Sequence, residues 1–164
     1  DVSNVTNMSE MFRDSEFNQL LNSWDVSNVK DMSGMFINSK FNQPIGDWNV
    51  SNVTNMNKMF KNTKFNQPIG DWDVGNVFEM GEMFSSSEFN QPLDSWDVSN
   101  VKDMSRMFSY SKFKQSINRW LLFEVTNMSE MFRGSEFHQN IHLQIKFVSD
   151  LMQKNTQNAD NLYF

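Results

Sequence analysis

The sequence contains no cysteine and few basic residues. The absence of cysteine excludes a disulfide framework and a thiolate metal site, and it leaves the redox compartment open, because a core of stacked repeats needs no cross-links. Only 14 lysines and arginines stand against 20 aspartates and glutamates, which gives a formal net charge of −6. Proteins that bind nucleic acid concentrate cations, so nucleic acid is not an expected partner.

Long apolar runs and catalytic motifs are also missing. No run approaches the ~18 apolar residues of a membrane span, and no charged-then-apolar signal segment opens the chain. There is no Gly-rich phosphate loop and no nucleophile motif, so we predict neither a cofactor nor an enzymatic activity. His138 and His142 lie four residues apart without a third ligand nearby, and this pair does not predict a zinc site.

What the sequence does contain is a repeat of 24 residues, rich in aromatic residues and methionine. The repeat places phenylalanine at Phe17, Phe41, Phe65, Phe89, Phe113 and Phe137, and tryptophan at Trp24, Trp48, Trp72, Trp96 and Trp120. A period between about 20 and 50 residues predicts an array in which each unit buries its apolar face by stacking on its neighbours. We expect six rungs over residues 1–143 and a degenerate C-terminal cap and tail over residues 144–164.

The repeat is already under way at the first residue, because Asp1 falls between the expected tryptophan and valine of a rung. We therefore expect a fragment of a longer protein, whose N-terminal cap and any export signal or anchor lie upstream. Contact with a membrane is expected only through an anchor outside this fragment.

Two shorter patterns lie within each rung. Trp48 and Val50 alternate with polar residues, which predicts a short parallel strand. Met56, Met59 and Phe60 have the i, i+3, i+4 spacing of one helical face, which predicts about a turn and a half of helix that begins after Asn55. The sequence thus predicts an α/β repeat solenoid with one short strand and one short helix in each rung.

Two sets of polar residues recur with the same period. A glutamine stands two residues after the phenylalanine of every rung, at Gln19, Gln43, Gln67, Gln91, Gln115 and Gln139. An asparagine follows the predicted strand at Asn4, Asn28, Asn52, Asn76 and Asn100. Polar residues repeated so strictly favour a structural role, in which their side chains satisfy backbone groups of the turns, over ligand binding.

The segment FNQPIGDWDVGNVFEMGEMF (65–84) and its neighbours resemble the BspA-like, mycoplasma-type lipoprotein repeat, a divergent leucine-rich repeat of bacterial surface proteins. The resemblance extends from residue 1 to about residue 143. It implies a right-handed, leucine-rich-repeat-like solenoid with parallel strands on one face and short helices on the other. It also implies display at the cell surface and an adhesin-like role, with a host or neighbouring-cell protein or glycan as partner.

The strand face is the predicted binding surface. If Trp48 and Val50 point inward, the polar residues beside them point outward and align from rung to rung. The candidate binding residues are Asp25, Asp47, Asn49, Asp71, Asp73, Asp97, Arg119, Leu121 and Phe123. Solvation explains these carboxylates better than calcium does, because calcium needs six or more converging oxygens and a strand face diverges. Repetition of the same aspartate also suits display better than a unique acid–base pair.

The pattern changes at residues 118–124, where Leu121 and Phe123 replace the usual aspartate and serine and Arg119 replaces aspartate or serine. One interpretation is an exposed docking patch at which a partner binds. The other is that Leu121 and Phe123 pack inward or beneath the C-terminal segment. Two functions follow from the whole sequence: a surface protein that binds a protein or glycan through its strand face, or a structural stalk that carries another domain.

Overall fold

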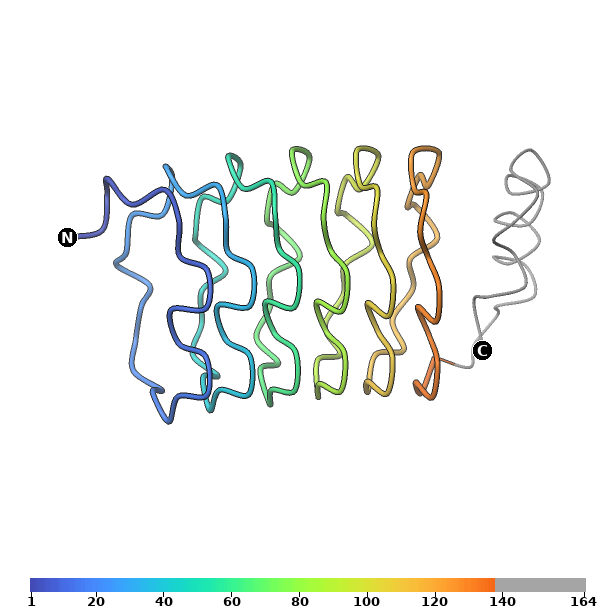
Figure 1. Cartoon of the computed structure of the whole chain (residues 1–164), viewed down its shortest axis with the longest axis horizontal. Helices are drawn as coiled ribbons and strands as arrows, with labels where there is room; N and C mark the ends of the chain where they lie inside the picture. Colours follow the sequence, from blue (N-terminus) through green and yellow to red (C-terminus); the bar gives the residue numbers. More distant parts are fainter. Residues whose placement is uncertain (138–164) are drawn as a thin grey trace.

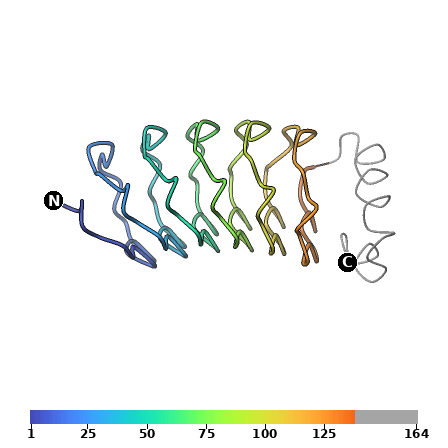
Figure 2. The same ribbon diagram turned by 90° about the horizontal axis from the view of Figure 1, so that it is seen from above.

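A computed structural model describes residues 1–137, which form a stack of six coils (Figure 1). We number these coils 1 to 6 in chain order, with residues 1–24, 25–48, 49–72, 73–96, 97–120 and 121–137. Five single parallel bridges join equivalent residues 24 positions apart, from Asn7↔Asp31 to Asp103↔Asn127. The 24-residue period of the sequence is therefore the period of the stack, and each coil lies against the next (Figure 2). The predicted cap and tail, residues 144–164, lie outside the described residues.

The described residues contain no helix, and their only strand-like pairing is the five single bridges. The predicted α/β solenoid, with a leucine-rich-repeat-like strand and helix in every rung, is therefore wrong. In its place each coil is a succession of turns joined by short extended segments. No helix in residues 1–137 is long and apolar enough to cross a membrane.

The predicted helix is absent because its N–H groups bond in two other directions. The N–H groups of Met59 and Lys61 donate to carbonyls three residues back, at 3.2 and 3.1 Å, and so close tight turns. The N–H groups of the alternate residues, Lys58, Phe60 and Asn62, donate to carbonyls of coil 4. Lys58 and Asn62 have positive φ angles of 59° and 54°, which a right-handed helix does not allow. The Asn55 side chain accepts from the N–H of Asn57 at 3.0 Å, in an Asx turn rather than a helix cap.

The predicted strand is absent because it is only three residues long and its backbone forms no bond to the next coil. Turns close on both sides of it, with the N–H of Trp48 donating to the Ile45 carbonyl and the N–H of Val53 donating to the Val50 carbonyl. Side chains make the connection between coils here: Trp48 Nε1 donates to the Leu21 carbonyl at 3.0 Å, and Asn52 Nδ2 donates to the Ser27 carbonyl at 2.8 Å. The same two bonds recur along the stack.

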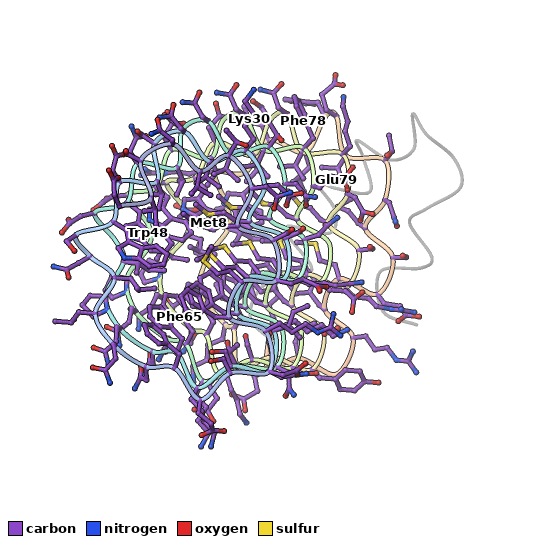
Figure 3. All side chains as sticks on the ribbon, turned by 60° about the vertical axis from the view of Figure 1, so that its left-hand side comes forward. Met8, Lys30, Trp48, Phe65, Phe78 and Glu79 are labelled. Carbon is purple, nitrogen blue, oxygen red and sulfur yellow. The ribbon has the colours of Figure 1, made fainter. Side chains whose placement is uncertain are left out.

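Two parallel columns of phenylalanine rings form the centre of the core. The first column contains Phe12, Phe36, Phe60, Phe84, Phe108 and Phe132, with successive ring centroids 5.5–5.8 Å apart. The second begins at Phe17 and ends at Phe137, with spacings of 6.0–6.4 Å. Within a coil the two columns touch, at 4.1–4.6 Å. Methionine and tryptophan complete the interior, where Met8, Trp48 and Phe65 point inward (Figure 3).

In coils 2 to 5 the repeated glutamines and asparagines have the structural role that the sequence predicts, because their side chains donate to the preceding coil. Gln91 Nε2 donates to the backbone carbonyl and the side-chain oxygen of Asn66 in the preceding coil, both at 3.2 Å. The same Asn66 side-chain oxygen accepts the N–H of Asn90 at 2.9 Å. Equivalent bonds recur at Gln67 and Gln115. These side chains link neighbouring coils where the backbone itself does not.

Candidate binding face

The candidate binding face consists of the turns around each tryptophan, residues 1–4, 22–28, 46–52, 70–76, 94–100 and 118–124; we call it the aspartate face. All nine predicted binding residues are exposed on it. The tryptophans between them, from Trp48 to Trp120, are at most 4% exposed. The alternation expected from the sequence therefore holds for side-chain burial, although no strand produces it.

Residues at one repeated position of the predicted site, such as Asp25 and Asp73, accept hydrogen bonds within their own turns. Asp25 Oδ1 accepts from the N–H and the hydroxyl of Ser27, at 3.1 and 2.6 Å. Asn49, Asp73 and Asp97 accept the N–H two residues ahead in the same way, at 3.0–3.2 Å. Hydrogen bonds from Ser27 and Ser99 lower the pKa values of Asp25 and Asp97, so these carboxylates stay ionised at neutral pH. Asp25 and Asp97 therefore form Asx turns and also carry exposed negative charges.

The aspartate face is strongly acidic. It carries eight carboxylates and a single basic side chain: Asp1, Asp25, Asp47, Asp71, Asp73, Asp94, Asp97 and Glu124, with Arg119. Another part of each coil is the segment with its two buried methionines, for example residues 55–62 with Met56 and Met59. Along these segments, side chains of opposite charge pair between neighbouring coils, as in Arg106–Glu130 at 2.7 Å and Lys58–Glu82 at 3.6 Å. A partner that docks on the aspartate face therefore meets mostly carboxylates.

The first turn of coil 6 lacks the side-chain hydrogen bonds that the equivalent turns of the earlier coils have. Leu121 has no oxygen to accept an N–H, and Glu124 replaces the asparagine that elsewhere donates to the preceding coil. The bond that closes the turn, from the Val125 N–H to the Leu122 carbonyl, lengthens to 3.3 Å, whereas its equivalents measure 2.9–3.0 Å. Glu124 bonds instead to Lys102 Nζ at 2.5 Å, which lowers the pKa of Glu124.

Leu121 and Phe123 point into solvent, with 47% and 58% of their surface exposed. The structure therefore rejects the interpretation in which they pack inward. The other interpretation, in which the C-terminal segment covers them, concerns residues 138–164, which lie outside the described residues. Arg119 lies beside them in the chain, and its Nε is 3.4 Å from Asp94 Oδ2 in the preceding coil. Its backbone N–H also donates to Asp94 Oδ1 at 3.0 Å. We call Arg119, Leu121 and Phe123 the apolar patch.

Asp94 is a residue of this site that the sequence reasoning missed, although the sequence contained a signal. The equivalent residues of the two preceding coils are Gly46 and Gly70, where an added Cβ would lie 2.9 Å from the carbonyl oxygens of Pro68 and Pro92. The coil after Asp94 has Ser116 in place of proline. Between these two coils, Asp94 replaces glycine and Ser116 replaces proline. This double replacement was the signal in the sequence that a side chain fits at position 94, where it contacts Arg119.

Residues 1–137 contain no group of three His, Cys, Asp or Glu side chains that could hold a metal ion. Asp25, Asp73 and Asp97 each accept a hydrogen bond from a backbone N–H of their own turn. His138 and His142 lie outside the described residues, so their arrangement is not addressed by the structure.

Comparison with known proteins gives one match. A family model described as "Mycoplasma protein of unknown function, DUF285" matches residues 1–86 and, in a second and overlapping alignment, residues 38–144. No curated protein and no solved structure matches the chain. The double match reflects the internal repeat, because the same pattern can be aligned at more than one register.

Proposed function

The chain belongs to the DUF285 family of Mycoplasma proteins, and we propose that it is a non-enzymatic, adhesin-like protein of the cell surface that binds a protein or glycan of a host or neighbouring cell through its aspartate face. The resemblance of the repeat to BspA-like surface proteins supports the location. The family description itself assigns no activity.

One observation supports the proposal: at two positions of the aspartate face that are not apolar in any earlier coil, coil 6 has the exposed apolar residues Leu121 and Phe123. Leu121 also removes the side-chain acceptor that forms the Asx turn at this position in earlier coils. A small apolar group beside an arginine, with Asp97 and Ser99 of the preceding coil as a polar rim, has the composition of a binding hot spot.

The alternative is a structural stalk that holds another domain at a distance. The regular bonds between coils favour it, since every interface repeats the same four backbone hydrogen bonds between alternate residues, as in Met8 to Asp31 and Met104 to Asn127. A stalk gives no reason for Leu121 and Phe123 to be exposed, however. The two functions differ in whether the isolated chain binds cells at all.

The test uses fluorescently labelled chain and cultured animal cells, with bound chain measured by flow cytometry. The variants Phe123→Ser and Leu121→Asp restore the residues that earlier coils have at these positions. We expect each to weaken binding at least tenfold, because a hot-spot residue contributes about 2 kcal/mol or more. Leu121→Asp should also raise the melting temperature slightly by rebuilding the Asx turn.

Phe78→Thr is the matched control. Phe78 is 44% exposed, it lies on a different edge (Figure 3), and threonine occupies its position in three other coils. This variant should bind as the parent chain does. Pretreating the cells with trypsin or with glycosidases distinguishes a protein partner from a glycan. Absence of binding by the parent chain would favour the stalk, and equal binding by all variants would show that Leu121 and Phe123 do not form the binding site.

A further inference from the structure

Coil 4 departs from the repeat at two positions of the segment with its two buried methionines, residues 79–86. This segment begins with asparagine or aspartate in the other five coils and with Glu79 in coil 4. The shorter side chains accept the N–H two residues ahead, as Asp103 accepts that of Ser105 at 2.6 Å. The Glu79 carboxylate makes no hydrogen bond or ion pair among residues 1–137, and the N–H of Gly81 makes no hydrogen bond there.

The second departure, Gly81, leaves a space that is lined by side-chain oxygens. A Cβ at Gly81 would lie 3.1 Å from Asn57 Oδ1, 3.3 Å from Ser105 Oγ and 3.5 Å from Asp103 Oδ1. The backbone does not require glycine here, because the φ angle of Gly81 is not positive and four other coils have serine at this position. Glycine therefore serves to leave room beside these three oxygens.

One of these oxygens is buried without a partner. Asn57 Oδ1 is the single buried side-chain nitrogen or oxygen among the described residues that has no hydrogen bond. Ser105 Oγ, across the same space, makes no hydrogen bond in this part of the chain either. A buried amide oxygen that has left water without finding a donor is unfavourable, so this oxygen points to a ligand.

The neighbouring basic side chains do not supply that ligand. Lysine or arginine follows Asn57 and Ser105 and precedes Asp103, but each of these basic residues pairs with a carboxylate elsewhere. The pairs are Lys58–Glu82 at 3.6 Å, Arg106–Glu130 at 2.7 Å and Lys102–Glu124 at 2.5 Å. The space beside Gly81 thus has negative charge in Asp103 and Glu79 and no cation of its own.

We propose that the space beside Gly81 binds a divalent cation of the calcium type. Its protein ligands are the carboxylates of Asp103 and Glu79, the amide oxygen of Asn57 and the hydroxyl of Ser105. Glu79 and Asp103 face each other in the parallel bridge between coils 4 and 5. Calcium accepts carboxylate and neutral oxygens in a flexible shell that water completes, whereas magnesium demands a nearly ideal octahedron.

This donor set differs from the aspartates of the aspartate face. It combines two carboxylates with two neutral oxygens, and so it is not a group of three acidic or histidine side chains. The ligands come from coils 3, 4 and 5, so a bound ion ties three successive coils together. The two carboxylates match the charge of the ion and indicate weak binding, with a dissociation constant of ~1 mM or below.

Compensation of volume explains less of what is observed. The larger Asn57 fills part of the room that the smaller Gly81 leaves, since most other coils have serine at both positions. Packing alone gives no reason for the Asn57 oxygen to lie there without a donor. It also gives no reason for Glu79 to replace an asparagine or aspartate that would have closed the turn.

The test measures the melting temperature of the full chain with about 10 mM calcium chloride and with sodium chloride of equal ionic strength. We expect calcium to raise the melting temperature by about 3 °C or more, because an ion that binds only the folded chain stabilises it. Isothermal titration with calcium should give one site per chain, and magnesium should bind more weakly.

Two variants restore residues that other coils have. Gly81→Ser fills the space, and Glu79→Asn removes one carboxylate while it gives the Gly81 N–H an acceptor. Both should melt no lower than the parent in sodium chloride, and both should lose most of the calcium shift. Asp73→Asn is the control, because it removes a carboxylate of the aspartate face and asparagine forms the same turn at Asn49.

The control should keep the full calcium shift. A parent chain that does not respond to calcium would overturn the proposal, as it would if the Asn57 amide donates to Asp103 instead. A calcium shift of equal size in the parent and in either Gly81→Ser or Glu79→Asn would also overturn it, since the ion would then bind elsewhere.

Discussion

Replacing Ser86 by glycine should stabilise the protein, because Ser86 holds a backbone conformation that favours glycine. Its φ angle is +56°, and it belongs to one of two columns of left-handed residues that run along the stack. The columns contain Glu10, Gly34, Lys58, Glu82, Arg106 and Glu130, and Asp14, Asn38, Asn62, Ser86, Tyr110 and Gly134. Only one residue in each column is a glycine. Strain is therefore distributed through every coil interface.

The expected magnitude follows from two opposing terms. A non-glycine residue in the left-handed region costs about 1–2 kcal/mol, which glycine avoids. Glycine loses more conformational entropy on folding, at a cost of about 0.5–1 kcal/mol. The Ser86 side chain is exposed and makes no hydrogen bond in the described chain, and its N–H keeps its bond to the Ser109 carbonyl at 2.8 Å. We expect a net gain of about 0.5–1 kcal/mol.

Urea denaturation measures this gain as a rise in the midpoint at constant slope. The control is Glu88→Gly, two residues further along: Glu88 is exposed, has no positive φ angle and forms no ion pair within 4 Å in the described chain. There the entropy term acts alone, and the variant should lose about 0.5–1 kcal/mol. Opposite signs for the two glycine variants support the reasoning. A loss of stability in both would refute it.

Three further predictions use the same urea measurement or its pH dependence. Trp72→Ala should cost about 3–5 kcal/mol as a core truncation, and Trp72→Phe less, about 1–3 kcal/mol, because it keeps an aromatic ring but leaves a smaller cavity and removes the bond from Nε1 to the Ile45 carbonyl. Asn66→Ala should cost about 1–2 kcal/mol because it leaves the Asn90 N–H without an acceptor, and Asn66→Asp should cost less. Burial alone would raise the pKa of Glu82, but Lys61 and Lys58 lower it below its ordinary value of 4.5. The stability advantage of Glu82 over Glu82→Gln should therefore be complete at neutral pH and disappear as the pH falls through that lowered pKa.

Much of the candidate binding face was predictable from the sequence, and its local chemistry was not. The exposure of Asp47, Asp71 and Asp73 follows from their place beside buried tryptophans, which is visible in the period. The use of Asp73 as a turn acceptor is not, because an Asx turn depends on backbone angles that the pattern leaves open. The sequence likewise left open whether Phe123 packs inward, and the structure shows that it does not, with 58% of its surface exposed.

The sequence by itself determined the 24-residue period, the division of each unit into inward and outward side chains, and the structural role of the glutamines and asparagines. Only the tertiary structure decided the backbone. The spacing of Met56, Met59 and Phe60 places three side chains on one face, and both a helix and a series of turns satisfy it. Which conformation forms depends on where the N–H groups find acceptors. In this chain the carbonyls of the next coil compete for every second N–H. Those carbonyls belong to residues about 24 positions away. A local sequence pattern therefore could not indicate that these bonds would form in place of the hydrogen bonds of a helix.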